Sequence, residues 1–140
     1  MNKKTKIVVG CIVLLVVFYL VWWFMPIHFI HGVKPEGVAS IQVFNDSRGI
    51  GFEITDPDDI TYLVEQIQQP IFKKMKFSFF YTGTLYRITF LDTDGAEIDS
   101  LAVNSYRLIR KDPFFYECDE SMGVVEYLEN LENTQLFQKA

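Results

Sequence analysis

Residues 7 to 25 read IVVGCIVLLVVFYLVWWFM, a run of 19 residues that contains no charged side chain. As an α-helix this run is roughly 28 Å long, close to the thickness of the hydrocarbon core of a bilayer. It has no polar face, whereas a surface helix of a soluble protein has one. A continuous helix also pairs its own backbone polar groups, which hydrocarbon requires. The run therefore predicts a transmembrane helix, with the lipid bilayer as the partner of residues 7–25.

The residues on either side of this run predict its orientation. Lys3, Lys4 and Lys6 precede it, and an excess of positive charge is typical of the cytoplasmic end of a membrane helix. Trp22 and Trp23 lie near its other end, where aromatic rings prefer the headgroup region. We expect a single-pass protein of the cell membrane, with residues 1–6 as a cytoplasmic tail and the C-terminal part outside the cytoplasm.

Two other interpretations of the run fit less well. A cleaved signal peptide ends in small residues at the cleavage site, whereas this run ends in Trp-Trp-Phe-Met before Pro26. The segment Val8-Val9-Gly10-Cys11 loosely resembles the lipid-attachment motif of lipoproteins. That motif follows a hydrophobic region, but Cys11 lies near the beginning of one. We therefore expect a signal-anchor that is retained.

The rest of the chain is acidic and long enough for one domain. About 106 residues follow position 34, enough for one hydrophobic core and too few for two. The chain has a formal net charge of −5, of which the three lysines before the anchor contribute +3, so the remainder carries −8. Because nucleic-acid binding requires Lys and Arg to neutralise phosphates, we expect no nucleic-acid partner.

The cysteine content indicates how this domain is stabilised. Cys11 and Cys118 are separated by the predicted membrane boundary, so we expect no disulfide within the chain. The domain then depends on its hydrophobic core. We expect Cys118 to be buried; pairing with another chain is the alternative.

Alternating apolar residues and turn residues predict an α+β domain over residues 38–132. The expected order is β-β-α-β-β-β-β-α, an antiparallel sheet with both helices on one face. The strands are expected near 38–44, 50–54, 71–81, 86–90, 98–103 and 106–110, with 114–116 as a candidate for one further short strand. The helices are expected from about 56 to 69 and from about 121 to 132, with Glu126, Glu129 and Glu132 facing water. Residues 133–140 are expected to fray.

The segment 26–37 is expected to be a flexible tether between anchor and domain. Its two prolines and two glycines prevent a continuous helix. His28 and His31 are three residues apart, but zinc needs three or four protein ligands. We interpret them as polar residues at the membrane interface.

The domain sequence offers little catalytic chemistry. No histidine follows position 31, and the chain has no G-x-S-x-G, H-E-x-x-H or phosphate-binding glycine loop. Asp92-Thr93-Asp94-Gly95 resembles part of a calcium loop, but Leu101 stands where its glutamate would be. We therefore expect no enzyme, no metal and no cofactor. A pair of catalytic carboxylates is the alternative, with these candidates: Asp56, Asp58, Asp59, Asp92 and Asp94.

One segment is unusually aromatic. Phe77, Phe79, Phe80 and Tyr81 would make a strand that is apolar on both faces. Either this strand is covered on both faces, or Phe80 contributes to an exposed patch for a partner. Three lysines precede the aromatic residues, and they either guard a sheet edge or bind an anionic partner. The possible partner surface therefore consists of Phe80, Lys73, Lys74 and Lys76.

Several short patterns resemble a known group of proteins. They are Val33-Lys34-Pro35-Glu36 with Ser40-Ile41, Ile54-Thr55-Asp56 with Asp59-Ile60, and Tyr86-x-Ile88-x-Phe90 before Asp94-Gly95. Over residues 33–131 the chain resembles small uncharacterised membrane-anchored or lipid-linked extracytoplasmic proteins of Gram-positive bacteria. The resemblance implies no catalytic residues.

These observations lead to three hypotheses of function. The first is a non-enzymatic extracytoplasmic binding or interaction module that meets a protein partner at the outer membrane surface. The second is a small-ligand sensor or carrier with an apolar pocket under the sheet. The third is a weak carboxylate-based enzyme.

Overall fold

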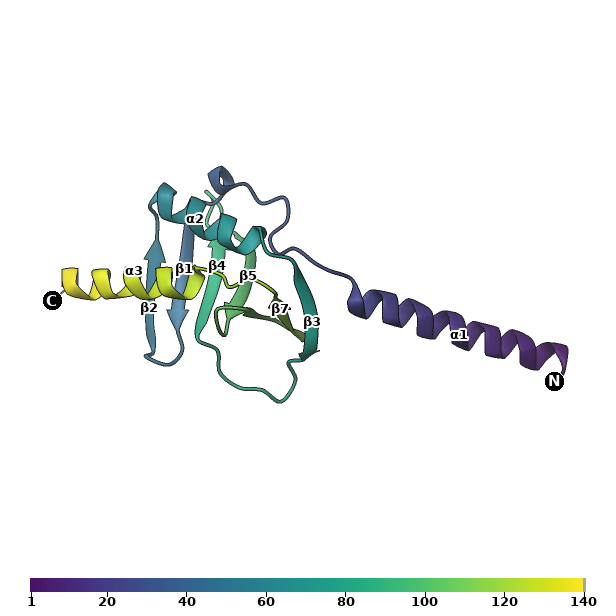
Figure 1. Ribbon diagram of the computed structural model, residues 1–140. Coiled ribbons are helices and arrows are strands. Elements are labelled where there is room, and N and C mark those ends of the chain that lie inside the picture. Colours follow the sequence, from purple (N-terminus) through teal and green to yellow (C-terminus); the bar gives the residue numbers. More distant parts are fainter. Residues whose placement is uncertain (140) are drawn as a thin grey trace.

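The computed structural model describes residues 1–139 and consists of a long N-terminal helix followed by one α+β domain (Figure 1). Helix α1 (Lys3–Phe24) projects away from the domain and buries none of its residues. With 22 residues, this helix is long and apolar enough to cross a membrane. Asn2 begins the helix by accepting a hydrogen bond from the backbone N–H of Thr5 at 2.9 Å.

The domain is built on one antiparallel sheet of seven strands in the order β2-β1-β4-β5-β6-β7-β3. The strands are β1 (Ser40–Asn45), β2 (Ile50–Ile54), β3 (Phe72–Phe77), β4 (Tyr86–Leu91), β5 (Glu97–Val103), β6 (Leu108–Lys111) and β7 (Phe114–Cys118). The α+β class is confirmed. The sequence pattern counted four strands between the helices, and β7, the short strand left open above, is the fifth.

Two helices cover one face of the sheet (Figure 1). Helix α2 (Pro57–Gln68) begins as expected, because the Asp56 carboxylate accepts a hydrogen bond from the Asp58 N–H at 2.8 Å. Its buried residues, Ile60, Leu63, Val64 and Ile67, recur at the i, i+3, i+4 and i+7 spacing by which the sequence indicates one apolar stripe. Helix α3 (Val124–Lys139) continues past Asn133, where fraying was expected; Ala140 lies outside the described residues.

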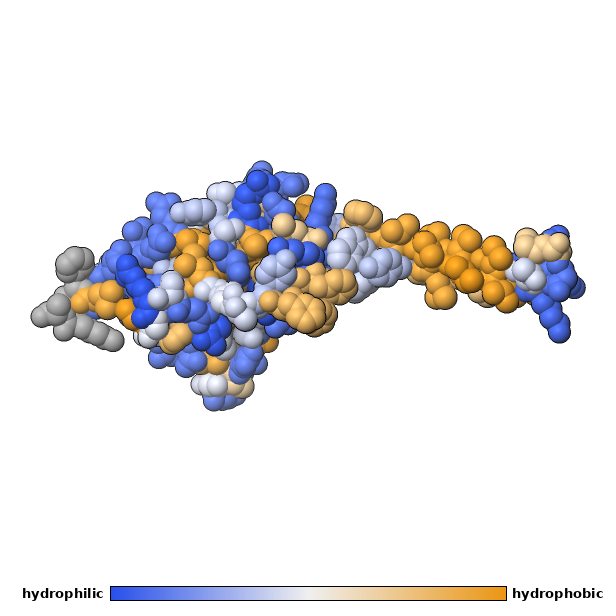
Figure 2. All heavy atoms as spheres, turned by 90° about the horizontal axis from the view of Figure 1, so that it is seen from below, coloured by the Kyte–Doolittle hydropathy of each residue, from blue (hydrophilic) through white to orange (hydrophobic). Residues whose placement is uncertain are grey.

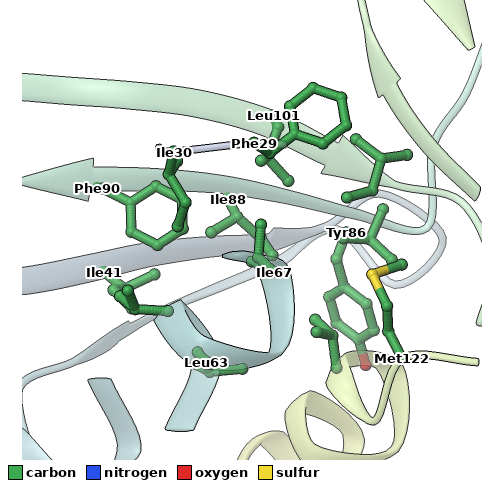
Figure 3. Packing of buried hydrophobic residues seen from close by; sticks show 14 of the residues in the cluster. Phe29, Ile30, Ile41, Leu63, Ile67, Tyr86, Ile88, Phe90, Leu101 and Met122 are labelled. Atoms are coloured by element: carbon green, nitrogen blue, oxygen red, sulfur yellow. The ribbon is translucent and has the colours of Figure 1, made fainter. Parts of the chain in front are cut away.

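The core lies between the helices and this face (Figure 3). Ile41, Ile88 and Phe90 point from the sheet toward Leu63 and Ile67 of α2. Cys118 is also buried, as predicted, and burial raises the pKa of its thiol. Side chains from α2, α3 and all seven strands thus close a single core.

The segment between anchor and domain belongs to the domain, so the predicted flexible tether is wrong. Phe29 and Ile30 are only 4% and 5% exposed, and the Phe29 ring packs edge-on against Phe72 at 4.9 Å between centroids. Ile27 forms a bridge with Phe72 beside β3, and the Gln68 side chain donates to the Ile30 carbonyl at 2.9 Å. The prolines and glycines exclude a helix here, but apolar side chains between them still have core surface to fill. A 3₁₀ turn at Pro35–Gly37 (η1) completes the segment.

The prediction that Glu132 faces water is also wrong. Glu132 is 2% exposed, whereas Glu126 and Glu129 are exposed as predicted. Its carboxylate accepts hydrogen bonds from Asn45 Nδ2 at 2.9 Å and Tyr86 Oη at 3.0 Å, and Arg48 Nη1 lies 3.0 Å away. Burial, followed by the hydrogen bond to Glu132, raises the pKa of Tyr86. This network ties α3 to β1 and β4, and its desolvated carboxylate is stabilised by three donors.

Candidate functional site

The face of the sheet opposite the helices carries a shallow groove of about 1150 Å³. Strands β1, β2, β4, β5 and β6 line it, together with the end of the β3–β4 loop. Its rim is charged, with Arg87, Arg110 and Lys111 as the bases and Asp46, Glu53 and Asp112 as the acids. The side chains at this face alternate with those that fill the core, so they are free to serve another purpose.

A single row of directly paired residues crosses this face from one edge of the sheet to the other. It contains Gly51, Phe44, Arg87, Ala102, Arg110, Phe115 and Lys76, one residue from each strand. The strand between the two arginines contributes only Ala102, so the row is lowest there. Neighbouring strands lie about 4.8 Å apart, which places the arginine backbones roughly 10 Å from each other. The row therefore presents two cations on either side of a small residue.

Each arginine is held by an aromatic ring and a carboxylate. Arg87 lies over the Phe44 ring at 4.8 Å, and its Nε and Nη2 donate to Asp46 Oδ1 at 2.9 and 2.7 Å. Arg110 lies 5.7 Å from the Phe115 ring, and its Nε donates to Asp112 Oδ1 at 2.9 Å. These contacts restrict rotation of both guanidinium groups, which reduces the entropy lost when a ligand binds.

The same two carboxylates hold the ends of the β3–β4 loop. Ser78 Oγ donates to Asp112 at 2.5 Å, and Thr84 Oγ1 donates to Asp46. The hydrogen bond from Ser78, followed by that from Arg110, keeps the pKa of Asp112 below its usual range. Burial tends to raise the pKa of Asp46, but the hydrogen bonds from Thr84 and Arg87 together lower it. Both acids are thus held in the charged form that the arginines require.

The loop contains the aromatic residues that were predicted to continue a strand, and that prediction is wrong. Strand β3 ends at Phe77, and the pairing with β7 shifts at Met75. Ser78 is 1% exposed and donates its N–H to the Pro113 carbonyl at 2.8 Å, which directs the chain away from the sheet. The Tyr81 ring packs on the Phe115 ring, with 5.4 Å between their centroids. Arg110 Nη1 donates a hydrogen bond to the Tyr81 carbonyl at 2.9 Å.

The four residues of the predicted partner surface do not form one patch. Lys74 pairs with Tyr116 and donates from Nζ to the Trp22 carbonyl at 2.9 Å, on the side where α1 meets the domain. Lys76 lies on the open face, with its Nζ 4.2 Å from the Tyr81 ring, and Lys73 is exposed. Phe80 projects from the loop, completely exposed. Strand β3 is an edge strand, the position at which lysines discourage pairing with other chains.

The candidate catalytic acids lie on two separate elements. Asp56, Asp58 and Asp59 lie at the start of α2, and Asp92 accepts from the N–H groups of Asp94 and Ala96 in the β4–β5 turn, both at 2.9 Å. Of these five acids, none lines the open-face groove or a smaller hollow of about 300 Å³ beside Arg48, Tyr86 and Glu132. Within residues 1–139 there is no group of three or more His, Cys, Asp or Glu that could hold a metal.

Sequence reasoning did not identify Arg87 as a site residue. Its neighbours come from sequence positions 15 to 43 residues away, so only the strand order reveals the row. Two arginines at outward positions of predicted strands were the available signal. Comparison with known protein families, characterised proteins and solved structures found no significant match. The resemblance to Gram-positive anchored proteins therefore stays a prediction.

Proposed function

We propose that the protein is a single-pass membrane protein whose extracytoplasmic domain is a non-enzymatic interaction module. The cross-strand row on the open face supports this proposal more than any other observation. Its two arginines are oriented by Phe44 and Phe115 and separated by Ala102. A partner segment that carries carboxylate groups fits this arrangement, because guanidinium groups bind carboxylates through paired hydrogen bonds.

The binding surface is the open groove rather than a pocket under the sheet. Between sheet and helices the side chains are closely packed, with Ile41, Ile67 and Phe90 each 0% exposed. The open-face groove is wide and shallow, which favours a protein segment over an enclosed small molecule. The acidic partner would have to displace or share Asp46 and Asp112, so we expect moderate affinity and rapid exchange.

The test is site-specific photo-crosslinking in intact cells. A photoreactive amino acid replaces Ser100, which is exposed and lines the groove, and in a matched chain it replaces Asn130, which is exposed on α3. We expect a discrete protein adduct from position 100 and none from position 130. Equal adducts at both positions, or none at position 100 while a known membrane complex is trapped, would contradict the proposal.

Two variants identify the contribution of the row. Ala102→Leu fills the lowest part of the groove, and Arg87→Ala removes one cation, so each should reduce the adduct from position 100 severalfold. Arg107→Ala is the matched control, because Arg107 is 48% exposed in its side chain and does not line the groove. Loss of the adduct in Arg107→Ala alone would assign the contact to another surface.

A further inference from the structure

The side of the domain next to α1 exposes a group of large apolar side chains, here called the aromatic edge. It runs from Ile71, just before β3, through β3 and into the first part of the β3–β4 loop. The members are Ile71, Met75, Phe77, Phe79 and Phe80, with exposures of 54%, 47%, 45%, 55% and 103%. Figure 2 shows apolar atoms gathered on the domain beside the end of α1. Such a cluster costs free energy in water, and it therefore indicates a contact surface.

The aromatic edge is continuous with the end of the membrane helix. The Trp23 ring lies 5.6 Å from Phe77, and Phe77 stacks on Phe79 at 5.7 Å. Lys74 fixes this junction, because its Nζ donates to the Trp22 carbonyl and lies 4.5 Å from the centre of the Trp22 ring. The lysine also neutralises the negative end of the α1 dipole. The domain is thus attached to the anchor by contacts that keep the aromatic edge beside the two tryptophans.

Phe80 is presented by a loop that is held at both ends. Its φ of 69° is in the left-handed region, which a bulky residue rarely adopts. The bonds from Ser78 to Asp112 and from Arg110 to the Tyr81 carbonyl maintain this conformation. The loop therefore directs one fully exposed ring outward at the expense of backbone strain, a combination that is typical of functional positions.

We propose that the aromatic edge inserts into the headgroup region of the outer leaflet and holds the domain against the bilayer. This inference rests on the proposed function, because it requires α1 to cross the membrane. Trp22 and Trp23 define the level of the interface, and Phe77, which contacts Trp23, lies at that level with Phe79 stacked on it. Burial of the apolar rings in the headgroup region provides the attraction. The orientation leaves the open face of the sheet accessible to a partner from the side.

The test measures the depth of nitroxide labels in phosphatidylcholine vesicles that contain the full chain. Labels are attached to Phe80→Cys in a Cys11→Ala background, where the remaining Cys118 is 1% exposed, and to Asn130→Cys as the matched control. Figure 1 places α3, which carries Asn130, at the opposite end of the domain from α1. We expect the ratio of oxygen to nickel-chelate collision rates to be severalfold higher at position 80 than at position 130. Met75→Cys provides a second position that does not depend on the loop.

A label on the native Cys11 separates this inference from the membrane span itself. Cys11 is exposed within α1, so its label reports whether the helix enters hydrocarbon. A deep label at position 11 with water-accessible labels at positions 80 and 75 would overturn the aromatic-edge contact and leave the anchor intact. A water-accessible label at position 11 would overturn both. Spin–spin coupling between labels at position 80 would overturn the lipid contact in favour of a second copy of the chain.

Discussion

The two faces of the sheet differ in how their side chains are held. The face under α2 and α3 is closed by apolar residues such as Phe72 and Phe90, each 0% exposed. On the open face, side chains are held by charge pairs and cation–aromatic contacts, as in Arg87 between Asp46 and Phe44. Burial of apolar area contributes far more free energy than exposed ion pairs do. The covered face thus stabilises the domain, and the open face is free to bind.

The largest effect that tests this contrast comes from Phe72→Ala. Phe72 pairs with Cys118 and packs edge-on against Phe29, so the shortened side chain leaves a cavity in the core. We expect a loss of about 3–5 kcal/mol in the free energy of unfolding. The measurement is urea unfolding of the full chain in detergent micelles.

Phe44→Ala is the matched control on the open face, where Phe44 is 37% exposed. It should cost less than about 1 kcal/mol, because the ring leaves no enclosed cavity. An equal loss in the free energy of unfolding for Phe72→Ala and Phe44→Ala would show that the covered face does not stabilise the domain more than the open face does.

An intermediate effect is expected from Glu132→Ala. The substitution removes the carboxylate that accepts hydrogen bonds from Asn45 Nδ2 and Tyr86 Oη, so these two buried donors lose their acceptor. We expect a loss of about 2 kcal/mol, smaller than for a fully buried ion pair, because the Arg48 side chain is 54% exposed. Glu129→Ala, one turn earlier and exposed, should change the free energy by less than about 0.5 kcal/mol. A neutral Glu132→Ala would mean that the network does not stabilise the attachment of α3.

The smallest effect is expected from Asp46→Ala on the open face. At neutral pH the lost contacts to Arg87 and Thr84 should cost about 0.5 kcal/mol, as for other exposed ion pairs. The folded-state pKa of Asp46 is lowered, so this contribution exists above its ordinary pKa of about 4 and disappears as the pH falls through the lower, folded-state value.

Unfolding experiments at a series of pH values check this prediction. The difference between the native chain and Asp46→Ala should shrink steadily as the pH falls below about 4. Asp94→Ala, in an exposed turn, serves as the control and should show no such pH dependence. A difference that stays constant through this range would mean that the Asp46 charge contributes nothing.

The lysines of β3 show how far sequence reasoning extends to the candidate site. Regular alternation along a strand places Lys74 and Lys76 on the same side. The extra residue at Met75 shifts the register, so the two side chains lie on opposite faces. Ser78, expected to continue the strand, is buried and bound to Asp112 from 34 residues away. A local pattern cannot reveal a bulge or a partner that distant.

The sequence by itself determined the apolar helix, the α+β class, the strands of the β1–β2 and β4–β5 hairpins, and the apolar stripe of α2. These features depend on residues within a few positions of one another, through helix periodicity, alternation and capping. Only the tertiary structure decided that Phe29 and Ile30 join the core, that Glu132 is buried, and that Arg87 and Arg110 share one row. Each of these results depends on contacts between distant segments, and such contacts form only when packing selects one strand order and one register.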